Sequence, residues 1–331
     1  MLWIEKYRPS GFNEIVGQDQ VVRKLSSFAI SGTVPHLILT GPHGTGKSAA
    51  IECFAHALYR ENWEMNTSVF QTADLFLQGK SYLEQEERYT HLYQKNQSLI
   101  SNFKYIVKWY ASLRPLDAEF KLMVFEDAHA LTLEAQQALR RIMERTSTTC
   151  RFVFSTTNQS ILIPAITSRC LPLFFTPVEP HIMFRHLREI REKEQAEKHA
   201  CSDDDLELIV QAAQGDMRRA VLLLQIALDT GRCGDLFTIA QSETANVTAS
   251  AITALKEGDV RSAIRRLESL MIDYGLSGGE VLAEIRTITQ REYNHPSLAI
   301  ALADAEYRMR HANNEFVQMG AFATGIQGIF T

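Results

Sequence analysis

Eight consecutive residues, Gly41–Ser48, place glycines, a lysine and a hydroxyl side chain at the spacing GxxxxGK[ST]. Glycines allow backbone N–H groups to curl around phosphate oxygens, and the positive N-terminus of a following helix also attracts phosphate. Lys47 would contact the β- and γ-phosphates, and the Ser48 hydroxyl would bind Mg2+. The segment therefore predicts a nucleoside triphosphate site. Its phosphate-binding residues are the whole loop: Gly41, Pro42, His43, Gly44, Thr45, Gly46, Lys47 and Ser48.

Two acidic residues, Glu126 and Asp127, directly follow the apolar run Leu122–Phe125. A phosphoryl-transfer site needs a carboxylate near the metal and a group that activates water. Because ligands bind beyond the carboxyl ends of parallel strands, an acidic pair at a strand end fits both needs. We interpret Glu126 as a Mg2+ ligand, acting through water, and Asp127 as the residue that polarises the attacking water. A solvated acidic turn is the alternative.

Three further polar residues could contact a triphosphate. Asn158 follows a strand-like segment and could orient the attacking water. Arg169, in the segment Ser168–Cys170, could stabilise transition-state charge in its own site or in a neighbour's. Arg218 begins a helix that Asp216 can cap, and from there it could reach a phosphate. Taken alone, each is also explained as an ordinary surface residue.

Four basic residues are candidate contacts with a DNA backbone: Lys108, Arg114, Arg140 and Arg141. Phosphate contacts give salt-dependent binding that is independent of base sequence. Each residue could equally be a solvated charge. The whole chain has a net charge of -5, with 34 Lys and Arg against 39 Asp and Glu, so composition neither supports nor excludes DNA.

Short apolar runs separated by helical segments would hold these residues in place. Four runs have the length and composition of buried strands: His36–Thr40, Lys121–Phe125, Arg151–Ser155 and Leu171–Phe175. Helical periodicity marks Ser48–Leu58 and Leu133–Arg145. This alternation predicts an α/β fold with a parallel sheet covered by helices on both faces. Residues 67–104 have no clear pattern and could be helical or a mobile insertion.

The chain changes character after Thr176, since helical periods dominate beyond His181 and no strand pattern follows. The expected helices are His181–Glu197, Asp203–Ala213, Met217–Asp229, Asn246–Leu255, Val260–Asp273, Gly279–Arg291, Pro296–His311 and Asn314–Phe330. Pro177–Pro180 and the Gly-rich stretch Thr230–Gly234 are natural boundaries. We therefore expect an α/β domain over 1–176, a three-helix domain over 177–232 and a larger all-helical domain over 233–331.

The cysteines and the apolar segments indicate the compartment. The five cysteines are scattered without a CxxC pair, which is typical of a reducing environment. The first residues lack the apolar core of a signal peptide, and no run of 18 apolar residues occurs. We expect a cytoplasmic protein that has no membrane partner.

The order of these motifs resembles that of the AAA+ clamp-loader ATPases, specifically the small subunit of archaeal and eukaryotic replication factor C. The similar segments are Trp3–Pro9, Ile15–Gln18, Pro35–Pro42, Ala135–Glu144, Ser168–Cys170 and Gly215–Ala220. The resemblance is dense over residues 2–230 and weaker over the helical C-terminal region. It implies an AAA+ P-loop core, a helical lid and a helical collar that forms oligomers.

The resemblance also implies ligands and roles. Val16 and Gly17 would line the adenine pocket, Arg169 would act in trans in a neighbouring subunit's site, and Arg218 would be the lid's second sensor. The cofactors would be ATP and Mg2+. The partners would be other small and large replication factor C subunits, the sliding clamp and primer–template DNA. ATP at subunit interfaces would hold the clamp open, and hydrolysis would release it on DNA.

The acidic box departs from the family pattern. It normally reads Asp-Glu-Ala-Asp, but Glu126–His129 reads Glu-Asp-Ala-His, with the two acids in swapped order. Asp127 is one methylene shorter than the usual Glu and would hold water farther from the γ-phosphate. Because a misplacement of ~1 Å can lower a rate ~100-fold, we expect ATP binding with weakened or absent hydrolysis.

A second departure follows Asn66. Residues 67–102 replace a short turn of the family that carries an Arg associated with DNA, and we expect the next helix to resume near Ile106. DNA contact by this chain is therefore less strongly implied than its family.

Two other functions stay open. The first is a structural subunit that binds nucleotide permanently, lends Arg169 to a neighbour and hydrolyses nothing, which the Glu126–Asp127 order favours. The second is another AAA+ motor, such as a helicase loader.

Overall fold

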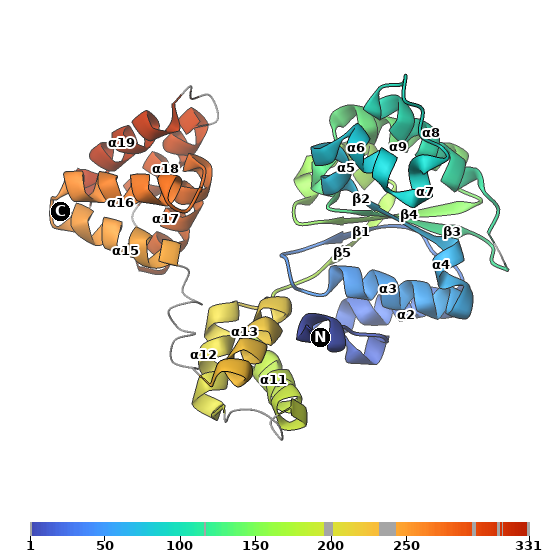
Figure 1. The fold of residues 1–331 in the computed structure, drawn as a ribbon, viewed down its shortest axis with the longest axis horizontal. Coiled ribbons are helices and arrows are strands. Elements are labelled where there is room, and N and C mark those ends of the chain that lie inside the picture. The colour runs from blue at the N-terminus through green and yellow to red at the C-terminus, as the bar shows by residue number, and fades with distance from the viewer. Residues whose placement is uncertain are drawn as a thin grey trace. The chain divides into compact units, whose positions relative to one another are not determined.

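A computed structural model describes residues 2–115, 117–194, 201–231, 243–292, 296–309, 312 and 314–329 of the chain. The chain divides into two units, Met1–Gly231 and Arg232–Thr331 (Figure 1). The first contains a sheet and helices, whereas the second contains helices throughout its described residues. The expected domain boundary at residues 232 and 233 lies outside the described residues, and the division into three domains stays a prediction.

The sheet of the first unit has five parallel strands in the order β2-β3-β4-β1-β5. Their bounds are β1 His36–Thr40, β2 Thr67–Gln71, β3 Lys121–Glu126, β4 Cys150–Thr156 and β5 Cys170–Phe174. The four expected strands are confirmed, and β2 is an additional edge strand. The sequence did not indicate it because Phe70 is its one fully buried residue.

The segment 67–104 is therefore neither one helix nor an insertion without structure. After β2 it forms α5 (Thr72–Gln78), α6 (Lys80–Gln85) and α7 (Glu87–Thr90). The next helix, α8 (Leu99–Ser112), begins well before Ile106, because the Ser98 hydroxyl accepts the Ser101 N–H at 3.1 Å and caps it. Our expectation that this helix resumes near Ile106 was wrong.

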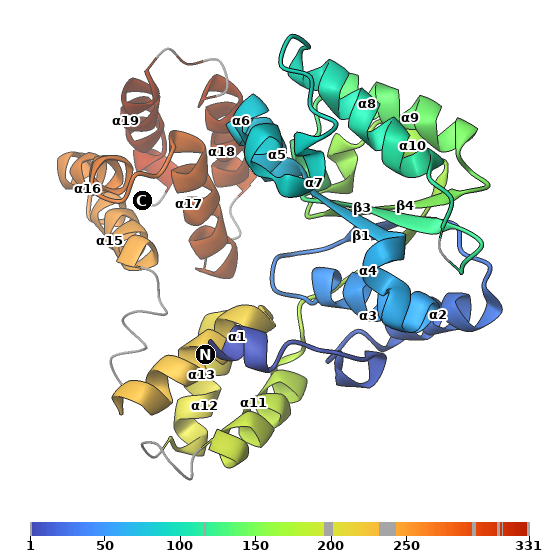
Figure 2. The ribbon, with the colours of Figure 1, turned by 45° about the vertical axis from the view of Figure 1, so that its right-hand side comes forward.

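Helices cover both faces of the sheet (Figure 2). On one face lie α2 (Asp19–Ser31), α3 (Lys47–Tyr59) and α4 (Trp63–Asn66). On the other lie α5–α8, α9 (Leu133–Arg145) and the short α10 (Pro164–Thr167). Strand β3 shows why both faces must be covered. Leu122 and Val124 belong to one apolar core, whereas Met123 and Phe125 belong to the other. Because successive side chains of a strand point to opposite faces, β3 contributes apolar side chains to the core on each side of the sheet.

Three helices complete the first unit: α11 (Pro180–Glu194), α12 (Asp203–Ala213) and α13 (Met217–Thr230). Ser202 begins α12 with a capping box, and Asp216 caps α13. The short N-terminal helix α1 (Trp3–Lys6) packs against α13, where the buried Trp3 donates its backbone N–H to Gln225 Oε1 at 2.9 Å. The first residues of the chain thus belong structurally with this helical part.

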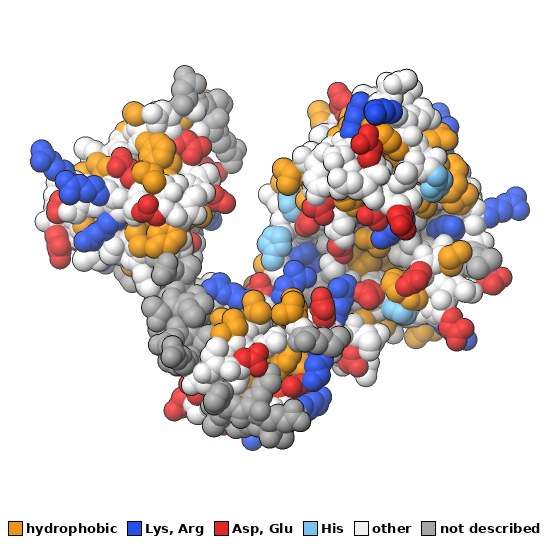
Figure 3. Space-filling view, in the orientation of Figure 1, with side chains coloured by type: hydrophobic (Ala, Val, Ile, Leu, Met, Phe, Trp, Pro, Cys, Tyr) orange, Lys and Arg blue, Asp and Glu red, His pale blue; other side chains and the backbone are white. Residues whose placement is uncertain are grey.

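The second unit has its own apolar core, made by α15 (Glu243–Lys256), α16 (Val260–Ile272), α17 (Gly278–Glu292), α18 (Pro296–Met309) and α19 (Glu315–Gly325). The expected ends of three helices, Glu197, His311 and Phe330, lie outside the described residues. Within the described part of the chain, no helix is both long and apolar enough to cross a membrane. Acidic and basic side chains are interspersed on the visible face of each unit (Figure 3).

Candidate nucleotide site

The loop Gly41–Gly46 connects β1 to α3, as a phosphate loop must. It begins against the end of β5, because a Cβ at Gly41 would lie 2.2 Å from the Phe175 carbonyl oxygen. The Gly41 N–H donates to the Thr156 carbonyl at 3.2 Å, which ties the loop to the end of β4. Helix α3 starts at Lys47, so its unpaired N–H groups face the loop. The geometry suits the binding of an anion.

Lys47 lies over this loop and donates from Nζ to the carbonyls of Gly41 at 2.7 Å and Pro42 at 2.6 Å. Burial lowers the pKa of the Lys47 ammonium, the nearby Asp127 carboxylate opposes that shift, and the Arg218 guanidinium adds to it. The carboxylates of Asp216 and Glu126 also oppose the lowering of the Lys47 pKa. The fold therefore brings one lysine, one arginine and three acids from three separate segments to the phosphate loop.

Glu126 ends β3, and Asp127 follows it in the left-handed region with φ +50°. A non-glycine residue in this region is uncommon, although Asp tolerates it better than most. Gln71 Nε2 donates to Glu126 Oε2 at 3.0 Å. The Thr72 hydroxyl contacts the carbonyl oxygens of Glu126 and, at 2.7 Å, of Asp127. Residues from the end of β2 thus hold the acidic turn in place.

Sequence reasoning missed Gln71 and Thr72 because it missed β2. The signal was a polar pair directly after Phe70, the buried residue of that strand. Once β2 is known to lie beside β3, with Gln71 opposite Glu126, this pair is expected at the same sheet edge as the acids.

Asn158 follows β4 and begins the 3-10 turn Gln159–Ile161. Its Oδ1 accepts the Ser160 N–H at 2.9 Å, so the amide NH2 is the end of the side chain that can donate to a ligand. Because β4 pairs with β1, this turn lies beside the phosphate loop. Gln136 was also missed: its side chain contacts Leu131 O, Ile161 O and Ile163 N, and so joins α9 to the same turn.

Arg218 lies in the first turn of α13, and the start of this helix touches the phosphate loop. The Met217 N–H donates to the Gly44 carbonyl at 3.1 Å. A Cβ at Gly44 would lie 1.7 Å from Asp216 Oδ1. The same Asp216 oxygen accepts the Arg219 N–H at 2.9 Å. Asp216 is therefore a neighbour of the loop as well as a helix cap.

Val16 and Gly17 lie where the sheet meets the first of the three helices that follow it. A Cβ at Gly17, whose φ is +73°, would lie 3.0 Å from Val178 Cγ1. The next side chain, Gln18, donates to Thr176 O at 2.7 Å and accepts the Thr176 N–H at 3.3 Å. The structure fixes this segment against the connection between β5 and α11.

Oxygen donors for a hard cation are present at the loop. The Ser48 hydroxyl lies in the first turn of α3, and Glu126 belongs to the charged group around Lys47. Among the described residues no group of three or more His, Cys, Asp and Glu could hold a metal. One hydroxyl and one carboxylate fit Mg2+, which usually keeps several waters and binds substrate phosphates rather than a cage of protein ligands.

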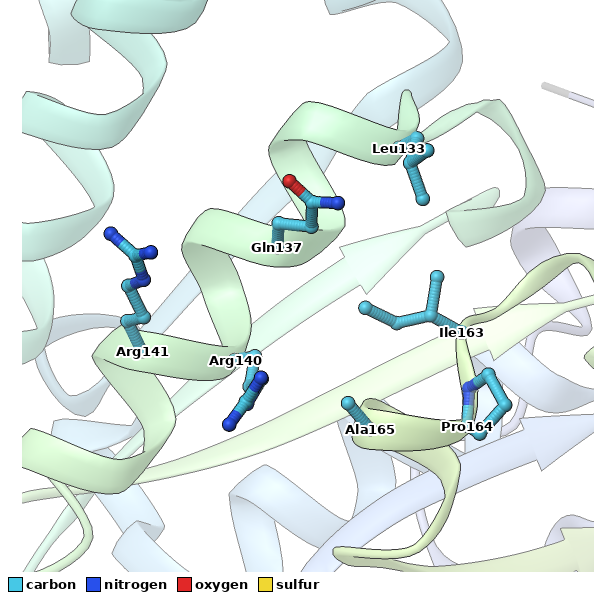
Figure 4. A pocket seen from close by; sticks show the side chains of 7 residues that line it. All are labelled: Leu133, Gln137, Arg140, Arg141, Ile163, Pro164 and Ala165. Atoms are coloured by element: carbon cyan, nitrogen blue, oxygen red, sulfur yellow. The ribbon is translucent and has the colours of Figure 1, made fainter.

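Arg169 and the four candidate DNA residues lie elsewhere. Arg169 contacts α9 and α10, binding Glu144 Oε1 at 2.5 Å and the Ala165 carbonyl at 2.7 Å. Lys108 and Arg114, in and after α8, are exposed. The exposed Arg140 and Arg141 help to line a pocket of about 550 Å³ between α9 and α10 (Figure 4).

The sheet order, the phosphate loop and the helices around them define a P-loop nucleotide-binding fold of the AAA+ class. Two solved structures of RuvB mutants from Thermotoga maritima share this fold, with TM-scores of 0.55 and 0.51 at 15% and 16% identity. Each match covers 89% of this chain and 91% of the other. A family model described as DNA polymerase III, delta subunit, matches residues 17–179.

Curated relatives match the chain over nearly its whole length. Replication factor C small subunit from Picrophilus torridus is 32% identical over 335 residues, covering 99% of this chain and 98% of the relative. The protein of the same name from Archaeoglobus fulgidus is 33% identical over 330 residues, covering 97% and 95%. The chain belongs to the replication factor C small-subunit family, whose members are clamp-loader subunits in DNA replication, and the predicted family is confirmed.

Proposed function

We propose that this chain binds ATP and Mg2+ as the small subunit of a clamp loader that opens the sliding clamp and places it on primer–template DNA. The convergence of Lys47, Asp127 and Arg218 at the phosphate loop carries the proposal. These residues come from α3, the turn after β3 and α13, so a bound triphosphate would join the core to the helices that follow it. With this function we also propose that the chain divides into a core, a lid and a collar, and that it acts in the cytoplasm.

The loop residues would divide the work of binding. The N–H groups of Gly41–Ser48 and the charge of Lys47 would hold the phosphates, with Arg218 approaching from α13. Ser48 and Glu126 would hold Mg2+, which neutralises phosphate charge when bound. Val16 and Gly17 would contact the adenine. Asn158 would orient water through its amide NH2.

Five basic residues would contact the partners of this chain in the clamp loader. Arg169 would stabilise charge in the site of a neighbouring small or large replication factor C subunit, because its contacts lie with α9 and α10 rather than with its own loop. Lys108, Arg114, Arg140 and Arg141 would contact the DNA backbone, and their exposure is compatible with that role. Co-purification of the full chain with a sliding clamp and a larger loader subunit, followed by mass measurement of the intact complex, tests the assembly.

Hydrolysis in the chain's own site would be weak. Asp127 would have to polarise water with a side chain one methylene shorter than the usual Glu, and the turn that carries it is held by Gln71 and Thr72. Single-turnover ATPase measurements on complexes with Asp127→Ala or Arg169→Ala test this proposal. Both substitutions should lower turnover if the chain hydrolyses ATP itself.

A structural subunit is the second candidate. The bond from Gln71 to Glu126 favours it, because this bond occupies one oxygen of the proposed metal carboxylate. For such a subunit, Arg169→Ala would lower turnover of the complex, whereas Asp127→Ala would leave it unchanged.

A further inference from the structure

One carboxylate, that of Glu144, is shared by two arginines that belong to different segments. Its Oε1 contacts Arg169 at 2.5 Å and Arg140 Nε at 3.4 Å. Arg140 lies one helical turn before Glu144 on α9, whereas Arg169 follows α10 and precedes β5. All three side chains are between about one third and one half exposed, at 51% for Arg140, 43% for Glu144 and 35% for Arg169.

Arg169 has a long contact with the adjacent Ser168 hydroxyl at 3.5 Å, and two shorter contacts fix the plane of its guanidinium. One terminal nitrogen donates to the Ala165 carbonyl at 2.7 Å, and the other donates to Glu144. A guanidinium has five N–H donors in one plane, so donors remain after both contacts are made. A side chain held at two points keeps its remaining donors in a defined direction. Without these contacts, a long arginine side chain would lose more rotamer freedom when it engages a ligand.

The surroundings keep Glu144 in position. The buried side of α9 includes Leu139 and Met143, so the helix itself is anchored in the core. Ala165 lies across the pocket from Arg140, which places α10 beside the solvent-facing side of α9 (Figure 4). Two guanidiniums and one carboxylate leave a surplus of one positive charge, so the group still attracts phosphate.

We propose that Glu144 is a positioning residue for Arg169, holding its guanidinium ready for the triphosphate of a neighbouring subunit. The inference rests on the proposed function of Arg169 in trans. It adds Glu144, which lies on α9 and 25 positions before Arg169 in sequence, as a residue that determines how effectively Arg169 stabilises charge in the neighbouring site. Since Glu144 touches neither nucleotide nor metal in this scheme, its loss lowers the turnover rate and leaves the KM for ATP unchanged.

The experiment uses the complex that co-purifies with the full chain. Arg169→Ala first defines the part of ATP turnover that depends on Arg169. Glu144→Ala is expected to lower that part about two- to fivefold, the range that the coupling of an exposed ion pair allows. Glu144→Gln keeps an oxygen acceptor without the charge and should fall between Glu144→Ala and the wild type. Alanine is the best helix former, so α9 is retained, as a thermal unfolding midpoint would verify.

Glu192→Ala on α11 is the matched control. Glu192 pairs with Arg188 at 3.1 Å, also one turn apart on an exposed helix face, and this variant should turn over ATP like the wild type. Adding Glu144→Ala to Arg169→Ala should cause no further loss, because an effect that passes through Arg169 disappears with it.

Three results would overturn the inference. If Arg169→Ala lowers turnover while Glu144→Ala leaves it unchanged or raises it, Glu144 does not position Arg169, and the proposed function survives. If Glu144→Ala causes an equal loss in the Arg169→Ala background, it acts by another route. If Arg169→Ala has no effect, the trans role itself fails and the inference fails with it.

Discussion

Asp216, the cap of α13, lies against Gly44 in the phosphate loop, so closely that a Cβ at Gly44 would overlap its carboxylate. Gly44 also has φ +67°, which side chains disfavour. We expect Gly44→Ala to push α13 and Arg218 away from the loop and to weaken ATP binding by about tenfold or more. Titration with a fluorescent ATP analogue measures this. Gly79→Ala is the matched control, since Gly79 has φ +65° but nothing within 4 Å of an added Cβ. Equal affinities of the two variants would contradict the prediction.

The acidic pair gives a second prediction. Exchanging the acids, with Glu126→Asp and Asp127→Glu together, lengthens the side chain at 127 and should bring its carboxylate closer to the attacking water. We expect ATP turnover of the complex to rise about tenfold or more. The affinity for ATP should change little, because Lys47 and the loop are unaltered. Unchanged turnover would mean that the order of the acids does not limit the rate.

A third prediction concerns acid stability. His36 Nδ1 accepts the Phe152 N–H at 3.0 Å, a bond that requires the neutral ring. Burial, with a smaller effect of Arg151, lowers the pKa of His36 from 6.5 to about 4. Because the folded-state pKa is depressed, the contribution of His36 to stability is complete above pH 6.5 and is lost as the pH falls towards 4.

The measurement is urea unfolding of the wild type and His36→Gln across this pH range. Between pH 6.5 and 4, the free energy of unfolding of the wild type should fall by up to about 3 kcal/mol more than that of the variant, which has no titrating group at this position. Parallel pH profiles of the two proteins would rule out His36 as the cause of acid sensitivity.

A fourth prediction tests the N-terminal helix. Trp3 is 3% exposed and packs against α13, so Trp3→Ala should lower the free energy of unfolding by about 3–5 kcal/mol. ATP binding should weaken too, because α13 carries Arg218. Leu2→Ala removes an apolar side chain from a neighbouring position that is 50% exposed, and it should have little effect in the same measurements. If Trp3→Ala and Leu2→Ala lowered the free energy of unfolding equally, burial of Trp3 would not be the cause of the effect.

The sequence predicts best where chemistry and structure lie close together in the chain. Gly41–Ser48 contains the glycines of the turn, the charged Lys47 and the first residues of α3, so the loop could be identified without any tertiary information. The strand β3 could likewise be predicted, because Leu122–Phe125 is apolar on both faces. Such runs occur in parallel strands that are buried on both sides.

What could not be predicted depends on contacts between distant residues. The edge strand β2 has one fully buried residue, so its pattern is too weak to distinguish it from a loop. The contacts of Arg169 with Glu144 and of Gly44 with Asp216 join positions 25 and 172 residues apart. The periodicity of the sequence cannot predict these two contacts, because they form only when the elements that carry the residues pack together in the fold.

The contact between Trp3 and Gln225 spans 222 residues. At roughly 5–20 residues per second, a ribosome needs about 11–44 s to travel that distance. Throughout this interval the growing chain holds a large aromatic side chain whose binding surface has not yet been made. Trp3 leaves the ribosome long before α13, yet it is among the last residues of its unit to dock, because it can do so only when α13 has emerged.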